Sequence, residues 1–548
     1  MINPVTALSR LWNLLSIYKK EVYQIYFYAL LNGLVNLSLP LGIQAIVIFI
    51  QTGQISTSWM ILVLFVLLGI AITGFLQVMQ LRIVEHIQQD IFARSAFEFA
   101  WRLPKIKLKE LDQIHAPELV NRFFDTLTIQ KGLPKILIDF SLAIFQIVFG
   151  LLLLAIYSPY FIILGVSLLA LLFVIFRITG PKGLRTSLKE SGEKYKLAHW
   201  LEEVARTNKS FKINSDSRLH MNKADAISHD YINARESHFK VLISQFRFII
   251  GFKVLVAAGL LLLGGFLVFQ GRMNLGQFVA SEIVIILIIN SVEKLLRIID
   301  TIYDVLTSLE KIGYVTDLDL DEHNEVMIPD YEPGLSIQAN NIEFAYKNQR
   351  IPLIDDLSFS IDAGSKVLLK GSGGSGKSTL LRLIAGMWEP HSGDILINEV
   401  SIAHACKTDL YPKIGFYLPT NQIFEGTIAE NITMGRDIPE QKIYETIELL
   451  NLRSFLSQQP RGIDTLLDAE GKTLPRSIIQ KLLIARAIIH EPELLLMEEP
   501  LVFIPENEKK AIAQYIMSPE RPWTVVLIPE YTGWDQFAND SITLSKAS

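Results

Sequence analysis

Six long apolar runs constrain the fold of this 548-residue chain more than any other feature. They cover residues 23–50, 59–78, 137–157, 161–176, 248–269 and 278–289. About 20 apolar residues cross a hydrocarbon core as a helix, and the fourth and sixth runs reach that length with flanking residues. The mean hydropathy of +0.33 is also too high for an ordinary soluble enzyme. The sequence therefore predicts six membrane-spanning helices.

Two long polar segments, residues 82–135 and 177–247, separate these runs. Both are rich in Lys and Arg, which favours a cytosolic location. An even number of spans places both chain ends on the same side. Residues 8–18 mix apolar and basic positions, which predicts an amphipathic helix that lies on the membrane before the first span.

The pattern changes after about residue 312. Residues 317–334 are acidic and rich in turn-forming residues, so we interpret them as a linker. From residue 335 to 548, short β-branched strands alternate with helical stretches, as in an α/β domain with a largely parallel sheet. The predicted fold is therefore multidomain, with an all-α six-helix transmembrane domain over residues 1–316 and an α/β P-loop domain over residues 335–548.

A glycine-rich motif lies between a β-rich run and a helix-like stretch of the second domain. It reads Gly371, Ser372, Gly373, Gly374, Ser375, Gly376, Lys377, Ser378 and Thr379. This is the G-x-x-x-x-G-K-[ST] pattern in the strand-to-helix context that it needs. The glycines let consecutive backbone N–H groups face one anion, and the helix N-terminus adds partial positive charge. The motif predicts nucleoside triphosphate binding, with Lys377 on the β- and γ-phosphates and Ser378 on Mg²⁺.

Composition and spans exclude other classes of protein. The formal net charge of −5 provides no global basic field for nucleic acid. The single cysteine, Cys406, cannot form an intrachain disulfide, and we interpret it as an inert thiol. The six spans argue against a soluble P-loop ATPase.

Together, six spans, two long cytosolic segments and a C-terminal P-loop domain resemble a half-transporter of the ABC exporter family. Shorter motifs that resemble the family are residues 118–122, 271–280, 344–346, 389–395, 484–488 and 491–500. The resemblance covers nearly the whole chain. It implies a dimer in a lipid bilayer, either a homodimer or a heterodimer with a second half-transporter. It also implies the bacterial inner membrane, with the nucleotide-binding domain in the cytosol.

The resemblance further implies roles in an ATP and Mg²⁺ site. Tyr346 lies where the family places an aromatic ring that stacks on adenine. Glu499 lies where a carboxylate polarises the attacking water as a general base. Glu498 replaces the Walker B aspartate and is one methylene longer, and we expect it to contact Mg²⁺ together with Ser378.

The family's signature motif, Leu-Ser-Gly-Gly-Gln, falls on residues 474–478, which read Leu-Pro-Arg-Ser-Ile. In the family this motif caps the γ-phosphate held by the opposite subunit, through donors at a helix N-terminus. Pro475 supplies neither a hydroxyl nor an N–H group. Arg476 adds a side chain where a glycine lets the backbone approach closely. Arg476 is either a new phosphate contact or a solvated arginine.

Further positions depart from the family. Glu530 stands where a histidine would donate to the γ-phosphate, and an ionised glutamate would repel that phosphate. Thr420 stands at the Q-loop glutamine, with Gln422 close by. Residues 501–505 replace the D-loop and lack its polar and acidic members. The sequence thus predicts a domain that binds nucleotide but has compromised hydrolysis.

Some polar residues outside these motifs also need an interpretation. Asp139, Lys253 and Glu282 fall within apolar runs, where charged groups face an aqueous cavity or pair with one another. Asp139 could also lie outside the lipid. We expect Gln480 and Arg486 to be packing and surface residues of one helix.

Two functions stay open at this stage. The first is active export of a substrate driven by ATP. The second is a catalytically impaired or ATP-gated regulatory subunit that works with a competent half-transporter. No motif identifies the transported substrate, and the sequence does not choose between homodimer and heterodimer.

Overall fold

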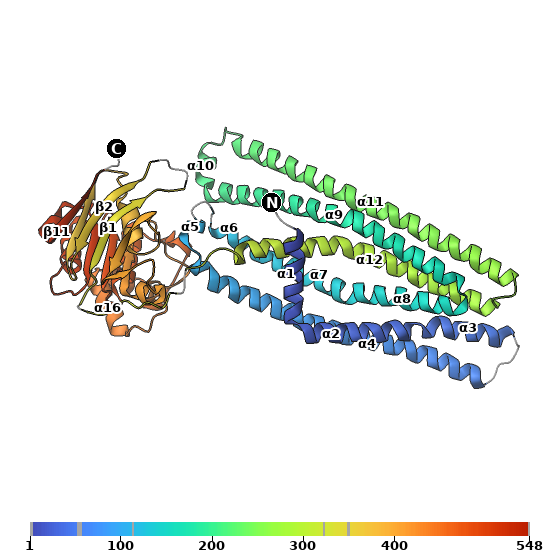
Figure 1. Ribbon diagram of the computed structural model, residues 1–548. Helices are drawn as coiled ribbons and strands as arrows, with labels where there is room; N and C mark the ends of the chain where they lie inside the picture. Colours follow the sequence, from blue (N-terminus) through green and yellow to red (C-terminus); the bar gives the residue numbers. More distant parts are fainter. Residues whose placement is uncertain are drawn as a thin grey trace. The chain divides into compact units, whose positions relative to one another are not determined.

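The computed structural model describes residues 4–51, 57–111, 114, 116–321, 324–331, 333–347 and 351–545. Two compact units make up the chain (Figure 1). The first unit comprises Met1–Lys105 and Gln113–Leu318. The second comprises Ile106–Asp112 and Asp319–Ser548. A short piece of the first long polar segment therefore packs with the C-terminal part of the chain.

Within the described residues, six helical segments are long and apolar enough to cross a membrane, which confirms the predicted spans. They are Lys19–Gln51, Thr57–Lys105, Ala116–Tyr157, Tyr160–Arg206, Leu219–Phe269 and Leu275–Thr316. Their main helices are α2 (Lys19–Asn36), α3 (Ser38–Gln51), α4 (Thr57–Arg102), α6 (Ala116–Asn121), α7 (Asp125–Pro134), α8 (Phe140–Tyr157), α9 (Tyr160–Arg206), α11 (Leu219–Phe269) and α12 (Leu275–Thr316).

The two polar segments are mainly continuations of these helices. Helix α4 continues to Arg102, and α9 and α11 extend together well beyond their apolar parts, side by side in Figure 1. Short helices occupy the turns between them: α5 (Leu108–Leu111) in the first segment and α10 (Asn208–Ile213) in the second. A separate helix, α1 (Pro4–Ile17), precedes the first span. The pattern of residues 8–18 predicts a helix here, and its location on the membrane surface stays a prediction.

Two of the charged residues in the apolar runs have clear settings. Lys253 on α11 forms an ion pair with Glu293 on α12, and Glu293 also pairs with Arg297 at 2.5 Å. Mutual pairing is one of the two settings expected for charges at membrane depth. Asp139 ends a π-helical turn, Lys135–Asp139, and this turn follows Pro134, which has no N–H group for a regular helical bond.

The second unit contains the predicted parallel sheet. Its strand order is β11 (Asp540–Leu544), β3 (Lys366–Gly371), β10 (Thr524–Ile528), β9 (Leu494–Glu498), β6 (Ile414–Tyr417), and all neighbours are parallel. A second, antiparallel sheet was not predicted separately. Its order is β2 (Ile354–Ile361), β1 (Ile337–Phe344), β4 (Ser392–Ile397), β5 (Val400–Ser401).

Both faces of the parallel sheet are buried, because alternate residues of each strand enter different cores. Leu495 and Val525 join one apolar cluster, which includes helices α18 (Arg476–Ile488) and α19 (Glu506–Ile516). Leu496 and Val526 join the other, which includes α13 (Lys377–Ile384) and the antiparallel sheet. This two-sided burial explains the nearly continuous apolar sequence of these strands. It also fixes the carboxyl ends of β3, β9 and β10, where the candidate site lies.

The remaining elements of this unit are short. They are β7 (Gly426–Thr427), β8 (Leu466–Leu467), α14 (Lys407–Leu410), α15 (Ile428–Thr433), α16 (Glu440–Leu449) and α17 (Arg453–Ser457).

Candidate functional site

The glycine-rich loop connects the end of β3 to the start of α13. Gly371, Gly374 and Gly376 have φ values of 147°, 76° and 91°, which residues other than glycine rarely adopt. A Cβ atom at Gly371 would also lie 2.6 Å from the Leu544 carbonyl oxygen. The Lys377 Nζ donates to the carbonyl oxygens of Gly371 and Ser372 at 2.9 and 2.8 Å. The three φ values explain why the motif needs glycine at these positions.

The two predicted Mg²⁺ contacts lie next to each other. The Ser378 hydroxyl donates to Glu498 Oε1 at 2.5 Å. Glu498 ends β9, next to Ile528 of β10 in the parallel register. Hydroxyl and carboxylate oxygens are the ligands that Mg²⁺ prefers, usually with phosphate and water oxygens completing the shell. The longer side chain of Glu498 therefore still reaches the loop serine.

Tyr346 lies just after β1, beside the helix that the loop opens. Its hydroxyl and Thr379 Oγ1 are 2.9 Å apart. Its ring packs edge-on against Trp388 and Phe344, with centroids 5.5 and 5.1 Å away. These contacts bring the predicted adenine-stacking residue to the phosphate-binding loop and leave it half-buried.

Glu499 occupies an unusual backbone conformation directly after β9. Its φ of 48° lies in the left-handed region, which is uncommon for a residue with a side chain and occurs often at functional sites. Its backbone N–H donates to the Ile528 carbonyl at 3.0 Å, which fixes the turn against β10. The side chain is exposed at the same end of the sheet as the glycine-rich loop.

Glu530, at the position of the family's histidine, has a specific partner. Its Oε1 accepts a hydrogen bond from the Leu501 N–H at 2.7 Å. Burial raises the pKa of the Glu530 carboxyl to about 7, and the Glu499 charge adds to the shift. The sequence predicts the loss of a histidine donor at this position. The hydrogen bond from Leu501 also gives Glu530 a structural role, because it holds the turn that follows Glu499.

Gln480 and Arg486 both form hydrogen bonds that connect α18 to neighbouring segments. Gln480 is only 3% exposed, donates to the Tyr417 hydroxyl at 2.9 Å and accepts from the Phe503 N–H at 2.7 Å. Arg486 donates to the carbonyl oxygens of Asn431 and Gln422 at 2.7 and 3.0 Å. Gln480 is thus a packing residue, which is one half of the expectation, and Arg486 is half-buried and not a free surface residue. Polar residues at positions 480, 481 and 486 inside an otherwise apolar helix sequence were the available signal.

Pro475 caps the N-terminus of α18, and it is exposed. Its carbonyl accepts from the N–H groups of Ile478 and Ile479 at 3.0 and 3.1 Å. The Arg476 guanidinium lies over the Phe503 ring, 5.1 Å from its centroid. Arg476 thus contacts an aromatic ring of its own chain, which neither of the two sequence interpretations included.

The position of the Q-loop lies in the turn between β6 and β7. Thr420 and Gln422 are both exposed there. Arg486 donates a hydrogen bond to the backbone carbonyl oxygen of Gln422. The structure therefore fixes the course of this turn through α18 and leaves the two side chains at the surface.

Comparison with known proteins agrees with this geometry. Residues 23–292 match the family model of the ABC transporter transmembrane region, and residues 354–502 match the ABC transporter model. The two matched regions are consecutive in one chain and together cover most of it.

Individual relatives are more distant. The alpha-hemolysin translocation ATP-binding protein HlyB of Escherichia coli is 25% identical over 357 residues, which are 62% of this chain and 50% of HlyB. The leukotoxin export ATP-binding protein LtxB of Aggregatibacter actinomycetemcomitans is 27% identical over 310 residues, 53% of this chain and 43% of LtxB. The chain thus spans about half the length of these curated relatives.

A solved structure shows the same fold along nearly the whole chain. It is the structure of a bacterial Atm1-family ABC exporter with ATP bound, which matches with a TM-score of 0.82 and 20% identity. The match covers 97% of this chain and 95% of that one. Since the transmembrane-region model and the ABC transporter model match consecutive parts of one chain, the chain belongs to the ABC transporters, and it has the fold of an exporter-type half-transporter.

Proposed function

We propose that this chain exports a substrate across a bacterial inner membrane as one half of a dimeric ABC transporter, with intact ATP binding and weak hydrolysis. The observation that carries this proposal is a contrast between two sets of motif residues. The glycine-rich loop, Ser378 and Glu498 are arranged to hold phosphate and Mg²⁺. The positions that would act on the γ-phosphate carry Pro475 and Glu530 instead of donors.

ATP binding is supported by the loop and its surroundings. Lys377 and the loop N–H groups supply positive charge for the β- and γ-phosphates. Tyr346, held by Thr379 and Trp388, supplies a ring beside the loop for the adenine base. Mg²⁺, when bound by Ser378 and Glu498, would neutralise phosphate charge.

Weak hydrolysis follows from the transition state. The charge that develops on the γ-phosphate needs donors aimed at it, and one such donor is worth roughly 3–4 kcal/mol. The Glu530 carboxylate accepts from Leu501, so it occupies the histidine position without offering a phosphate donor when ionised. Glu499 remains to orient water, but orientation alone leaves most of the barrier in place.

A second candidate is a regulatory subunit that binds ATP and depends on a competent partner half-transporter. The observation that favours it is the set of bonds around residues 501–503. Glu530 and Gln480 hold the N–H groups of Leu501 and Phe503 within this chain. As a regulatory subunit, this chain would bind ATP, and the partner half-transporter would carry out the hydrolysis.

One preparation tests both proposals. The complex is purified from native membranes, its subunits are identified, and phosphate release is measured in lipid. A homodimer with slow release that Glu499→Gln lowers further supports the exporter with weak hydrolysis. A stable second half-transporter with phosphate release that Glu499→Gln in this chain leaves unchanged supports the regulatory subunit. Fast release by the homodimer, unaffected by Glu499→Gln, would contradict both.

A further inference from the structure

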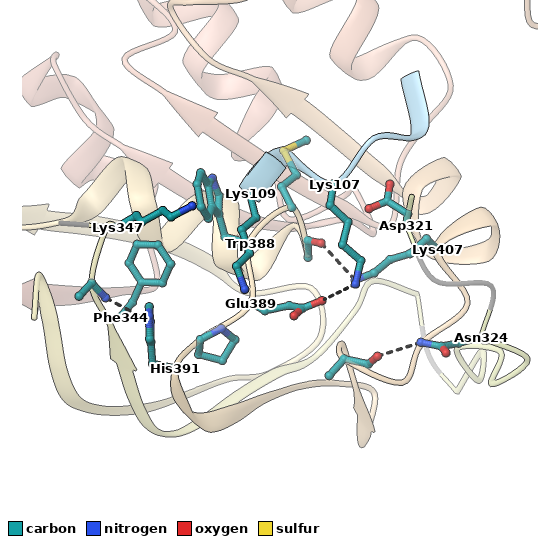
Figure 2. Close-up of a pocket in the computed structure, with 15 residues that line it drawn as sticks. Lys107, Lys109, Asp321, Asn324, Phe344, Lys347, Trp388, Glu389, His391 and Lys407 are labelled. Atoms are coloured by element: carbon teal, nitrogen blue, oxygen red, sulfur yellow. Dashed lines mark hydrogen bonds and ion pairs between the residues drawn. The ribbon is translucent and has the colours of Figure 1, made fainter. Parts of the chain in front are cut away.

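A cavity of about 330 Å³ lies in the C-terminal unit, and no residue of the glycine-rich loop lines it (Figure 2). Its wall combines Lys107 and Lys109, which belong to the same unit, with the chain around Trp388 and with Lys347 after β1. Ligand sites in proteins begin at about this volume. The cavity is therefore large enough for a small organic molecule.

The distant segment is fixed to the cavity by its backbone. Ile106 forms an antiparallel bridge with Leu320, and the Lys107 N–H donates to the Asp319 carbonyl at 2.9 Å. Ile106 is buried, with 4% of its surface exposed. These contacts place Lys109, two residues further along, at the cavity wall.

More basic than acidic side chains line the cavity. Four lysines line the cavity, namely Lys107, Lys109, Lys347 and Lys407, against two carboxylates, Asp321 and Glu389. Lys107 pairs with Glu389 at 3.7 Å, and Lys407 donates to the carbonyl oxygens of Gly386 and Ile402. Burial raises the pKa of the Asp321 carboxyl, against the opposing effect of Lys407 and Lys107. The wall therefore carries a surplus of positive charge.

Lys109 and Lys347 account for this surplus. Both are exposed, and among the described residues neither has a recorded hydrogen bond or ion pair. Figure 2 shows both side chains beside Trp388. An anion between the two ammonium groups would gain charge-assisted hydrogen bonds without breaking an existing ion pair.

Aromatic rings form another part of the wall. Trp388 and His391 each pack edge-on against Phe344, with centroids 5.6 Å apart. His391 Nδ1 accepts from the Ala345 N–H at 3.4 Å, so a neutral ring carries its proton on Nε2, as a further donor. An indole beside two ammonium groups suits a ligand with both an anionic and an apolar part.

We propose that this cavity binds a small organic phosphate, with its phosphate group between Lys109 and Lys347 and its organic part against Trp388. The site is separate from the loop that binds ATP. Its occupant touches Trp388, which packs against Tyr346 at 5.5 Å, the residue predicted to stack on adenine. This packing contact would link the two places, and any coupling of binding between them would be reciprocal.

The test is isothermal titration calorimetry on the full chain in nanodiscs, in a Lys377→Ala background that weakens phosphate binding at the loop. The probes are AMP, glycerol 3-phosphate and dioctanoyl phosphatidic acid. We expect Lys109→Gln and Lys347→Gln each to weaken binding about ten-fold, since each removes one charge-assisted contact. Lys109→Arg should bind like the background, and so should the matched control Lys510→Gln, which changes an exposed lysine on α19.

The three probes also identify the source of the phosphate. Binding of AMP or glycerol 3-phosphate assigns a soluble ligand, and binding of phosphatidic acid alone assigns a lipid headgroup. The proposal is overturned if none of the probes binds at millimolar concentration. It is equally overturned if Lys109→Gln and Lys347→Gln bind every probe as tightly as Lys510→Gln does.

Discussion

Lys377 is held over the glycine-rich loop by two carbonyl oxygens, at the place where phosphate charge would lie. Lys377→Ala should lower ATP affinity by about 2 kcal/mol, because a hydrogen bond between charged groups contributes on that order. Equilibrium binding of a fluorescent ATP analogue measures the change. Lys510→Ala, on an exposed face of α19, is the matched control. Equal affinities of the two variants would rule out the phosphate role of Lys377.

Glu530 should make stability depend on pH. Its folded pKa of about 7 lies above the ordinary value of 4.5, so the folded protein binds more protons between these values. Its contribution to stability is therefore complete below pH 4.5 and is lost as the pH rises through 7. The maximum effect is on the order of 3 kcal/mol.

A neutral isostere isolates this contribution. Glu530→Gln can still accept from the Leu501 N–H and cannot ionise. We expect its thermal unfolding midpoint, relative to wild type, to be higher at pH 8 than at pH 5.5. A constant difference between the two proteins across this range would show that Glu530 does not titrate there.

At the scale of elements, α18 organises the turn after β9 through Gln480. Gln480→Leu keeps a similar volume but leaves the Phe503 N–H without its acceptor, at a cost of about 1–3 kcal/mol. The thermal unfolding midpoint should fall, and Gln536→Leu, at an exposed position, should change it little. Equal midpoints for the two variants would mean that Gln480 does not hold this turn.

Elements with a strong repeated pattern were predictable. Six apolar runs gave six spans, and the strands that precede Gly371 and Glu499 were expected from their apolar, β-branched sequence. The antiparallel sheet was not expected as a separate layer, because β1 pairs with the distant strand β4, for example Ile337 with Ile397, and the burial pattern of β2 is irregular. Local patterns carry no information on such pairing.

Within the site, motif residues were predictable and their connections were not. The loop and its neighbours Tyr346 and Glu498 were found from spacing and resemblance, and the structure brings them together. The contact of Glu530 with Leu501 joins two turns 29 residues apart. The Gln480 contacts depend equally on how α18 packs, so only the folded chain shows them.

For the whole molecule, the six spans predict a definite topology. Single cysteines at Lys107, Lys212 and Ala547, in a Cys406→Ser background, should resist an impermeant thiol reagent added outside intact cells. Arg272→Cys is the matched control, because this residue is exposed in the turn between α11 and α12 and should be labelled. Labelling at any of the first three positions that equals labelling at 272 would contradict a cytosolic ATP-binding domain.

The final prediction concerns the proposed dimer, in which each ATP site would combine one chain's loop with the other chain's signature. Groups that act as a unit are not additive in their effects on catalysis. Glu530→His alone should therefore gain little while Pro475 still caps α18. Replacement of residues 475–477 by Ser-Gly-Gly together with Glu530→His restores donors on both sides of the γ-phosphate.

This joint replacement should raise turnover by at least about 100-fold, since one restored donor is worth 10²–10³ in rate. Phosphate release by the purified homodimer in lipid measures the change, with Glu499→Gln in the same background as the control for the general base. Fast release by the unmodified chain that Glu499→Gln abolishes would show that another group, such as Arg476, already replaces the missing donors.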